Sequence, residues 1–250
     1  FIYFMKDNNI KKHEWTENQA KSAHTPNFGK KYIGEPELLR MFGNVKNKKV
    51  LELGSGNGYW LDLLSKHGAI GTGIELEKKQ LELADKSNPK TSYIQGDIIK
   101  LEKLGLQTNS FDFVLLEHVL LEISSLKKIN KIMVDAFTLL KKSGVIVISE
   151  IHPFAPSTKP DNIIIPNDYN YFSSGSVIQI VSKRLDGKKT LYRDYHWTLS
   201  DLTNSLTQAG FYISEITEPK PSAKLAKKYS DLAYRQSTPM AFWIKAIKLK

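Results

Sequence analysis

Cysteine is absent from this chain of 250 residues. Its absence excludes disulfide bridges, thiolate metal sites, cysteine nucleophiles and cysteine-ligated iron–sulfur clusters. The composition is compatible with a cytoplasmic protein, and a cytoplasmic location is our expectation. We also expect no metal site.

Long apolar runs are missing as well. No stretch approaches the roughly 20 residues of a membrane-spanning helix, and the opening Phe1–Met5 is too short for the apolar region of a secretory signal. The hydrophobic fraction of 41% is enough for one well-buried domain with a lid or an insertion. We therefore expect a single domain over residues 1–250 and no membrane partner.

Excess positive charge is missing from the middle of the chain. The net charge of +10 divides into +5 for residues 1–49, −1 for 50–150 and +6 for 151–250. A basic excess can serve a nucleic acid, an acidic small substrate or an anionic surface. Here the lysines are scattered rather than clustered with aromatic residues, which favours a solvated surface. A nucleic-acid partner is therefore not favoured, although the sequence leaves it open.

Segments of strand and helix type alternate from residue 50 onward. Such alternation predicts an α/β fold, with a parallel sheet covered by helices on both faces. The last two strands are joined by a long polar connection, 218–239, so the final strand can run antiparallel. The expected strands are 50–53, 71–75, 92–95, 111–116, 145–150, 212–217 and 240–247. The expected helices are 33–42, 59–66, 78–86, 124–140 and 200–209.

One stretch, 50–60, combines an apolar strand pattern, three glycines and a helix start. Glycines at a strand-to-helix turn let a ligand approach the backbone, and the helix presents unpaired N–H groups to a polar ligand. Glu52, Gly54, Gly56 and Gly58 stand at alternate positions. A dinucleotide fingerprint would place its third glycine one residue later. The observed spacing instead resembles motif I of the class I S-adenosylmethionine-dependent methyltransferases.

Later strand ends extend this resemblance. Glu75 ends the second expected strand, where a carboxylate can accept both hydroxyls of a ribose. Asp97 follows the third strand and could accept from an adenine amino group, with Ile98 packed on the ring. The segment Phe111–His118 is also similar to the family. Specific motifs cover residues 33–150, and a looser likeness covers 196–250.

The resemblance implies a Rossmann-like seven-stranded methyltransferase fold, with a mostly parallel sheet, an antiparallel last strand and a lid insertion. It also implies S-adenosyl-L-methionine as the cofactor. The implied cofactor-binding residues are Glu52, Gly54, Ser55, Gly56, Gly58, Glu75, Leu76, Asp97, Ile98 and Glu117.

The domain divides by pattern into an N-terminal helical arm (1–49), a cofactor-binding core (50–150), a substrate-covering insertion (151–198) and a closing segment of helix and strands (199–250). The insertion is rich in proline and contains Asp-Gly between two alternating runs, which predicts a hairpin. We expect it to cover the carboxyl ends of the strands. Two fates are open for the aromatic residues Trp60, Phe154, Tyr171, Phe172 and Trp197, namely lining a substrate pocket or packing in the core, and core packing is the commoner.

Methyl transfer needs mainly proximity and alignment, with a base where the acceptor starts protonated. A neutral imidazole suits that task near pH 7. The candidate bases are His118, His152 and His196, with Glu117, Glu150 and Tyr195 as their partners. For His118 a structural role beside the cofactor is the favoured interpretation.

Three functions stay open. The first is a methyltransferase acting on oxygen or nitrogen of a small molecule, and the second is an RNA or protein methyltransferase that uses the basic flanks. The third is a protein that binds S-adenosylmethionine without catalysis. DNA-base amino methylation is disfavoured because Glu117–Leu120 stands where an Asn/Asp-Pro-Pro-Tyr/Phe run is needed, and C5-pyrimidine chemistry lacks its cysteine. The acceptor and the oligomeric state are not decided by the sequence.

Overall fold

The computed structural model describes residues 26–84, 91–155, 163–164, 168–183, 187 and 189–249. The first 25 residues of the expected N-terminal arm lie outside this part of the chain. No described helix has the length and apolar character needed to cross a membrane. The helical elements are η1 (Lys30–Gly34), α2 (Glu35–Phe42), α3 (Tyr59–Lys66), α4 (Lys78–Leu83), η2 (Ile98–Lys103), η3 (Leu120–Glu122), α5 (Leu126–Leu139), α6 (Leu199–Gln208), α7 (Ala223–Lys228), α8 (Ser230–Ala233) and η5 (Tyr234–Gln236).

The described strands form two sheets. The large sheet has the order β3-β2-β1-β4-β5-β10-β9, and the small one has the order β6-β7-β8. The strands are β1 (Lys49–Leu53), β2 (Ile70–Glu75), β3 (Thr91–Gln95), β4 (Phe111–Glu117), β5 (Leu140–Ile151), β6 (Ile163–Ile164), β7 (Val177–Lys183), β8 (Lys189–Tyr195), β9 (Tyr212–Thr217) and β10 (Ala241–Ile247).

The large sheet confirms the expected seven-stranded fold. Strands β1 to β5 pair in parallel, whereas β10 runs antiparallel to both β5 and β9. The strand order reverses beside β1, which has β2 on one side and β4 on the other. In an open α/β sheet, ligands bind beyond the carboxyl ends of the strands at such a reversal. The loops after β1 and β4 therefore define the place for a site.

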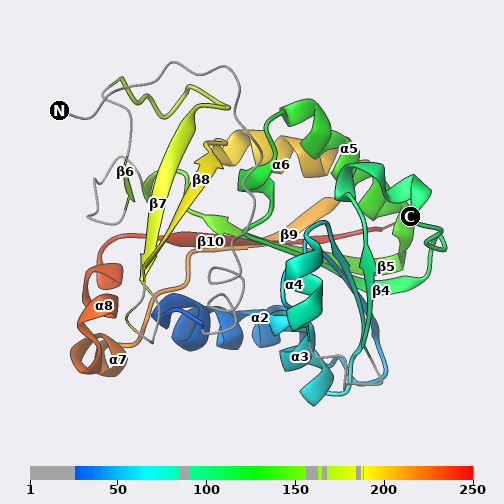
Figure 1. Ribbon diagram of the computed structural model, residues 1–250, viewed down its shortest axis with the longest axis horizontal. Coiled ribbons are helices and arrows are strands. Elements are labelled where there is room, and N and C mark those ends of the chain that lie inside the picture. The colour runs from blue at the N-terminus through cyan, green and yellow to red at the C-terminus, as the bar shows by residue number, and fades with distance from the viewer. Residues whose placement is uncertain are drawn as a thin grey trace.

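Alternating side chains bury both faces of this sheet. On one face, Val50, Leu115 and Trp243 pack with α2 and α3. On the other, Leu51 and Ile148 pack with α5 and α6. Figure 1 shows α2 and α3 on one side of the sheet and α5 and α6 on the opposite side. Because neighbouring strand residues point to opposite faces, an apolar pattern without gaps is what a sheet covered on both sides needs.

The small sheet lies in the expected insertion. Strands β7 and β8 form the predicted antiparallel hairpin, with Val177 opposite Tyr195. Ile178 of β7 packs with Ala155 and Met240, close to where β5 ends and β10 begins. The small sheet therefore adjoins the carboxyl end of β5. We call the insertion that contains it, 151–198, the cover, and its role in covering a substrate stays a prediction. Its short strand β6 was not expected from the sequence.

The polar connection between β9 and β10 contains helices that the sequence pattern did not predict, namely α7, α8 and η5. Tyr229, between α7 and α8, stacks on Tyr32 of η1 with ring centroids 4.8 Å apart, and Phe28 lies 5.2 Å from Tyr229. This contact joins residues far apart in the sequence, which explains why local patterning did not reveal it.

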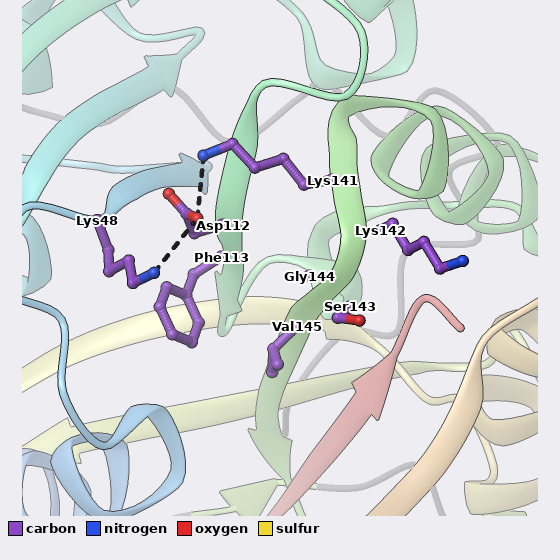
Figure 2. A pocket seen from close by; sticks show the side chains of 8 residues that line it. All are labelled: Lys48, Asp112, Phe113, Lys141, Lys142, Ser143, Gly144 and Val145. Carbon is purple, nitrogen blue, oxygen red and sulfur yellow. Dashed lines mark ion pairs between the residues drawn. The ribbon is translucent and has the colours of Figure 1, made fainter. Parts of the chain in front are cut away.

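A shallow pocket of about 200 Å³ lies at the opposite, amino-terminal edge of β4 and β5. Figure 2 shows Asp112 at its centre, paired with Lys48 and Lys141 at 3.8 Å and 3.0 Å. The Asp112 carboxylate also accepts from the backbone N–H of Lys49 at 2.9 Å. These contacts join the starts of neighbouring strands, so this pocket is a structural feature far from the carboxyl ends where the strand order reverses.

Candidate active site

The glycine loop after β1 has the backbone that a close ligand requires. Gly54, Gly56 and Gly58 all have positive φ, at 77°, 52° and 81°. A Cβ at Gly54 would lie 2.4 Å from the Val119 side chain, so this glycine lets the loops after β1 and β4 touch. A Cβ at Gly56 would meet no described atom within 4 Å. The loop is therefore open at Gly56, where a ligand can reach the main chain.

Glu75, at the end of β2, reaches this loop. Its two carboxylate oxygens accept from the backbone N–H groups of Gly56 at 2.9 Å and Glu77 at 2.8 Å. Burial raises the pKa of Glu75, although those backbone donors oppose the rise. Leu76 follows it, and its carbonyl accepts from Gln95 at 3.2 Å. Glu75 is thus fixed at the edge of the loop, and its contact with a ribose stays a prediction.

Asp97 and Ile98 come after β3. The Asp97 side chain accepts from the backbone N–H of Ile99 at 3.0 Å and so caps the start of η2. Ile98 is buried in the core on the α5 side of the sheet. Contact of these two residues with an adenine ring stays a prediction.

Several buried polar atoms in β1 and the loop after it have no hydrogen-bond partner among the described residues. They are Glu52 Oε2, Ser55 Oγ and Asn57 Nδ2, and each of these residues is at most 5% exposed. Buried polar groups in proteins are normally paired, so orphaned ones need an explanation such as a bound ligand. Together with the open position at Gly56, they fit a polar cofactor with both donors and acceptors.

Lys30 is a positively charged residue of the site that was not predicted from the sequence. Lys30 Nζ lies 3.5 Å from Glu117 Oε2, and 4.5 Å and 4.8 Å from the ring centres of Tyr59 and Trp60. Burial raises the pKa of Glu117, but the charges of Lys30 and His118 outweigh it and leave that pKa below its usual value. Lys30 is one of many scattered lysines, so no sequence signal distinguished it.

The pKa of Glu52 is raised, whereas that of Glu117 is lowered. Burial raises its pKa well above the usual value, the charge of Lys30 opposes the rise, and the charges of Glu117 and Glu75 add to it. An acid whose pKa is raised by folding destabilises the fold once pH exceeds its unfolded pKa, and the penalty grows until pH passes the folded pKa. Each unit of that shift corresponds to about 1.4 kcal/mol.

We therefore predict that Glu52→Gln stabilises the fold more at pH 8 than at pH 5, by at least about 1 kcal/mol in unfolding free energy. Urea unfolding of both proteins at the two pH values measures this. Other titrating groups are shared by the two proteins, so their difference isolates Glu52. An equal difference at both pH values would disprove an elevated pKa at Glu52.

His118 and His152 lie at the ends of β4 and β5. His118 has a positive φ of 55°, and its Nε2 lies 3.4 Å from Glu117 Oε1. Burial lowers its pKa, although Glu117 opposes this. His152 accepts from the backbone N–H of Phe154 through Nδ1, so its Nε2 carries a proton toward Glu218 Oε1 at 2.7 Å. Both rings are therefore held by neighbours. In His152 the Nδ1 lone pair and the Nε2 proton are both engaged, so this ring can accept a substrate proton only after Nδ1 releases the Phe154 N–H.

His196 and Tyr195 belong to the cover, the insertion over residues 151–198. His196 is 1% exposed, and its Nε2 donates to the Tyr171 carbonyl at 2.6 Å. Its Nδ1 lies 3.5 Å from the Tyr169 hydroxyl, and burial lowers its pKa. Tyr195 packs against the main core. In this structure both nitrogens of His196 have neighbours within the cover, and a role for it as the base stays a prediction.

The expected aromatic lining is only partly formed. Trp60 and Trp197 are core residues, at 2% and 4% exposed, because they pack between helices and the sheet. Trp197 also donates to the Leu120 carbonyl at 3.2 Å. Phe172, by contrast, is 83% exposed. These residues therefore stabilise the fold or face solvent rather than enclosing one pocket.

Two further buried carboxylates lie near the cover. Glu150, at the end of β5, was expected only as a partner of a candidate base, and it accepts from the backbone N–H groups of Val119 at 3.1 Å and Leu120 at 2.7 Å. Asp194, on β8, is 8% exposed and was not predicted as a site residue. For Asp194, an acidic residue within a strand-type sequence was the only signal.

The strand order, the open glycine loop at the reversal and the acid at the end of β2 define a Rossmann-like cofactor-binding protein. A family model for the methyltransferase domain matches residues 51–148. Residues 51–148 therefore form a class I S-adenosylmethionine-dependent methyltransferase domain, whose cofactor is S-adenosylmethionine.

Long matches extend beyond the core. An uncharacterized protein of Haemophilus influenzae is 27% identical over 232 residues, covering 87% of this chain and 88% of that protein. A crystal structure from Listeria monocytogenes, proposed to be an S-adenosylmethionine-dependent methyltransferase, is 25% identical with a TM-score of 0.64. It covers 87% of this chain and 99% of that one. Rat arsenite methyltransferase is 28% identical over 142 residues, which cover 48% of this chain and 37% of that enzyme.

Proposed function

We propose that this methyltransferase acts on an oxygen or nitrogen of a small molecule. The observation that carries this proposal is the cover over the carboxyl end of β5. Ile178 of the cover packs with Ala155 and Met240, and Trp197 bonds to the loop after β4. A covered site suits an acceptor that can be enclosed, since closing a site around the reacting groups excludes water and aligns them.

Under this proposal, each residue that binds the methyl donor, S-adenosylmethionine, has a particular role. Glu75 accepts the two ribose hydroxyls, Asp97 accepts the adenine amino group and Ile98 packs beside the ring. The open backbone at Gly56 lets the donor approach the loop. The positive charge of the donor is favoured by the carboxylate of Glu117, whose pKa is lowered, and Glu52 offers the donor a buried side-chain oxygen without a described partner. When bound, the donor supplies a methyl group activated by a positive sulfur.

The remaining cofactor-binding residues of the proposal are Gly54, Ser55, Gly58 and Leu76, which shape the loop and the end of β2. His118 and His152 are the candidate bases with an oriented ring near the strand ends. His196 and Tyr195 are proposed as acceptor-side residues of the cover.

A library of metabolites incubated with the protein and S-adenosylmethionine, followed by mass spectrometry, tests the proposed function. We expect one or more small molecules to gain the mass of a methyl group. Methylation confined to added RNA or protein would overturn the small-molecule acceptor. Donor binding without turnover on any acceptor would indicate a non-catalytic binding protein.

A further inference from the structure

Asp194 faces the body of the protein from the cover. It lies directly opposite Ile178 in the β7–β8 pairing, so the two side chains share one face of the small sheet. Ile178 packs with Ala155 and Met240, which places that face against the end of β5 and the start of β10. Asp194 is 8% exposed, and its carboxylate forms no hydrogen bond with a described residue. Among these residues it is a buried polar group without a partner.

Glu150 presents a second such oxygen from the sheet. It is 0% exposed, and its Oε1 accepts from the loop after β4 while its Oε2 has no partner among the described residues. Strand β8, which carries Asp194, packs against η3, and the Leu120 N–H of η3 donates to Glu150 Oε1, so the two acids lie on neighbouring segments. The charges of both Asp194 and Glu117 raise the pKa of Glu150. The cover and the sheet thus bring two buried carboxylates toward one another.

Neither carboxylate has a counter-charge in the part of the chain that the structure describes. No described lysine, arginine or histidine forms an ion pair with Glu150 or Asp194. Two buried acids in range of each other are costly unless a cation or a hydrogen-bond donor compensates them. Among the described residues, the backbone N–H groups of Val119 and Leu120 compensate only Glu150 Oε1, so a cationic ligand can supply the donors that Glu150 Oε2 and Asp194 lack.

We propose that Glu150 and Asp194 form an acceptor subsite that selects a small amine, with its nitrogen held between the two carboxylates. This inference rests on the proposed function and names the substrate class for the same site. A carboxylic acid or a phosphate ester would add negative charge to the pair and is expected to be rejected.

The subsite also offers a group that can accept the proton released by the amine substrate. An amine that arrives as an ammonium ion must lose a proton before its lone pair can attack. Burial raises the pKa of Asp194 to about 7, so near neutral pH its carboxylate can accept that proton. In the transfer, the nitrogen forms a bond to the methyl carbon, the sulfur–methyl bond breaks and its electron pair stays on sulfur. The proton lost by the nitrogen resides on Asp194.

The test compares wild type, Asp194→Asn and the control Asp168→Asn with matched sets of small amines, carboxylic acids and phenols. Asp168 is an exposed acid of the same insertion. We expect wild type to methylate amines. We expect Asp194→Asn to lose at least about tenfold in kcat/KM for them, with the dissociation constant for S-adenosylmethionine unchanged, and Asp168→Asn to keep both values.

The amide is nearly isosteric, and retained donor binding shows that the variant is folded. Full amine methylation by Asp194→Asn would overturn the role of this residue. Methylation of acids or phenols but not amines by wild type would overturn the inference while leaving the proposed function standing. Absence of any methylated small molecule would overturn both.

Discussion

Gly56→Ala is expected to lower the affinity for S-adenosylmethionine by at least about 100-fold, which corresponds to about 2.7 kcal/mol. Its added Cβ would meet no described protein atom within 4 Å, so the fold has space for it. The methyl group would instead project into the opening of the glycine loop, where the donor must approach. The residue also has a φ of 52°, so alanine adds strain at the same place. Isothermal titration calorimetry measures the loss.

A matched control separates the donor site from backbone strain. Gly105 has a φ of 67°, a Cβ there would also meet no described atom within 4 Å, and the residue follows η2 on the way to the start of β4. Alanine at either position should cost about 1–2 kcal/mol of stability. Only Gly56→Ala should lose donor affinity. Equal donor affinity in the two variants would contradict the placement of the donor at the loop.

At pH 5, where a carboxyl group of raised pKa carries little of the cost of ionisation, Glu150→Ala is expected to lower the unfolding free energy by about 3 kcal/mol, whereas Glu150→Gln should stay within about 1 kcal/mol of wild type. Alanine leaves the backbone N–H groups of Val119 and Leu120 without an acceptor, and the bond from Leu120 is buried. Each such loss costs about 1–3 kcal/mol. Glutamine keeps a carbonyl oxygen and carries no charge. Urea unfolding of the three proteins measures the differences.

The same pair of variants tests whether Glu150 of β5 also supports the glycine loop after β1. Val119 contacts the position that a Cβ would occupy at Gly54, so loosening the loop after β4 should disturb the loop after β1. Donor affinity is therefore expected to fall in Glu150→Ala and to persist in Glu150→Gln. If alanine and glutamine destabilise the protein equally, the two backbone hydrogen bonds are not what Glu150 contributes.

Local patterns predicted the parts of the fold that local forces determine. The strands of the large sheet and the hairpin were expected within a few residues of β1 to β5 and β7 to β10. Periods of two and 3.6 residues and turn residues are properties of short segments. The antiparallel direction of β10, which the family resemblance implied, is confirmed. Helices α7 and α8 were missed because they depend on contacts with η1, which lies almost 200 residues away in the sequence.

In the candidate site, too, residues in local motifs were predictable, whereas residues placed by tertiary contacts were not. The glycine loop and Glu75 were predictable because motif spacing encodes the loop's backbone. The pairing of Glu150 with the loop after β4 was not, since it joins residues about 30 positions apart through backbone groups that have no sequence signature. The place of Asp194 depends on how the cover folds over β5. Lys30 is one lysine among many, and only its position over Tyr59 and Trp60 distinguishes it.

Calorimetric titration of the wild-type protein with S-adenosylmethionine is the most direct test of the donor site, because every functional proposal depends on donor binding. We expect saturable binding at one site, weakened by Gly56→Ala and preserved in Gly105→Ala. Absence of any binding by wild type at millimolar donor would contradict the donor site at the glycine loop.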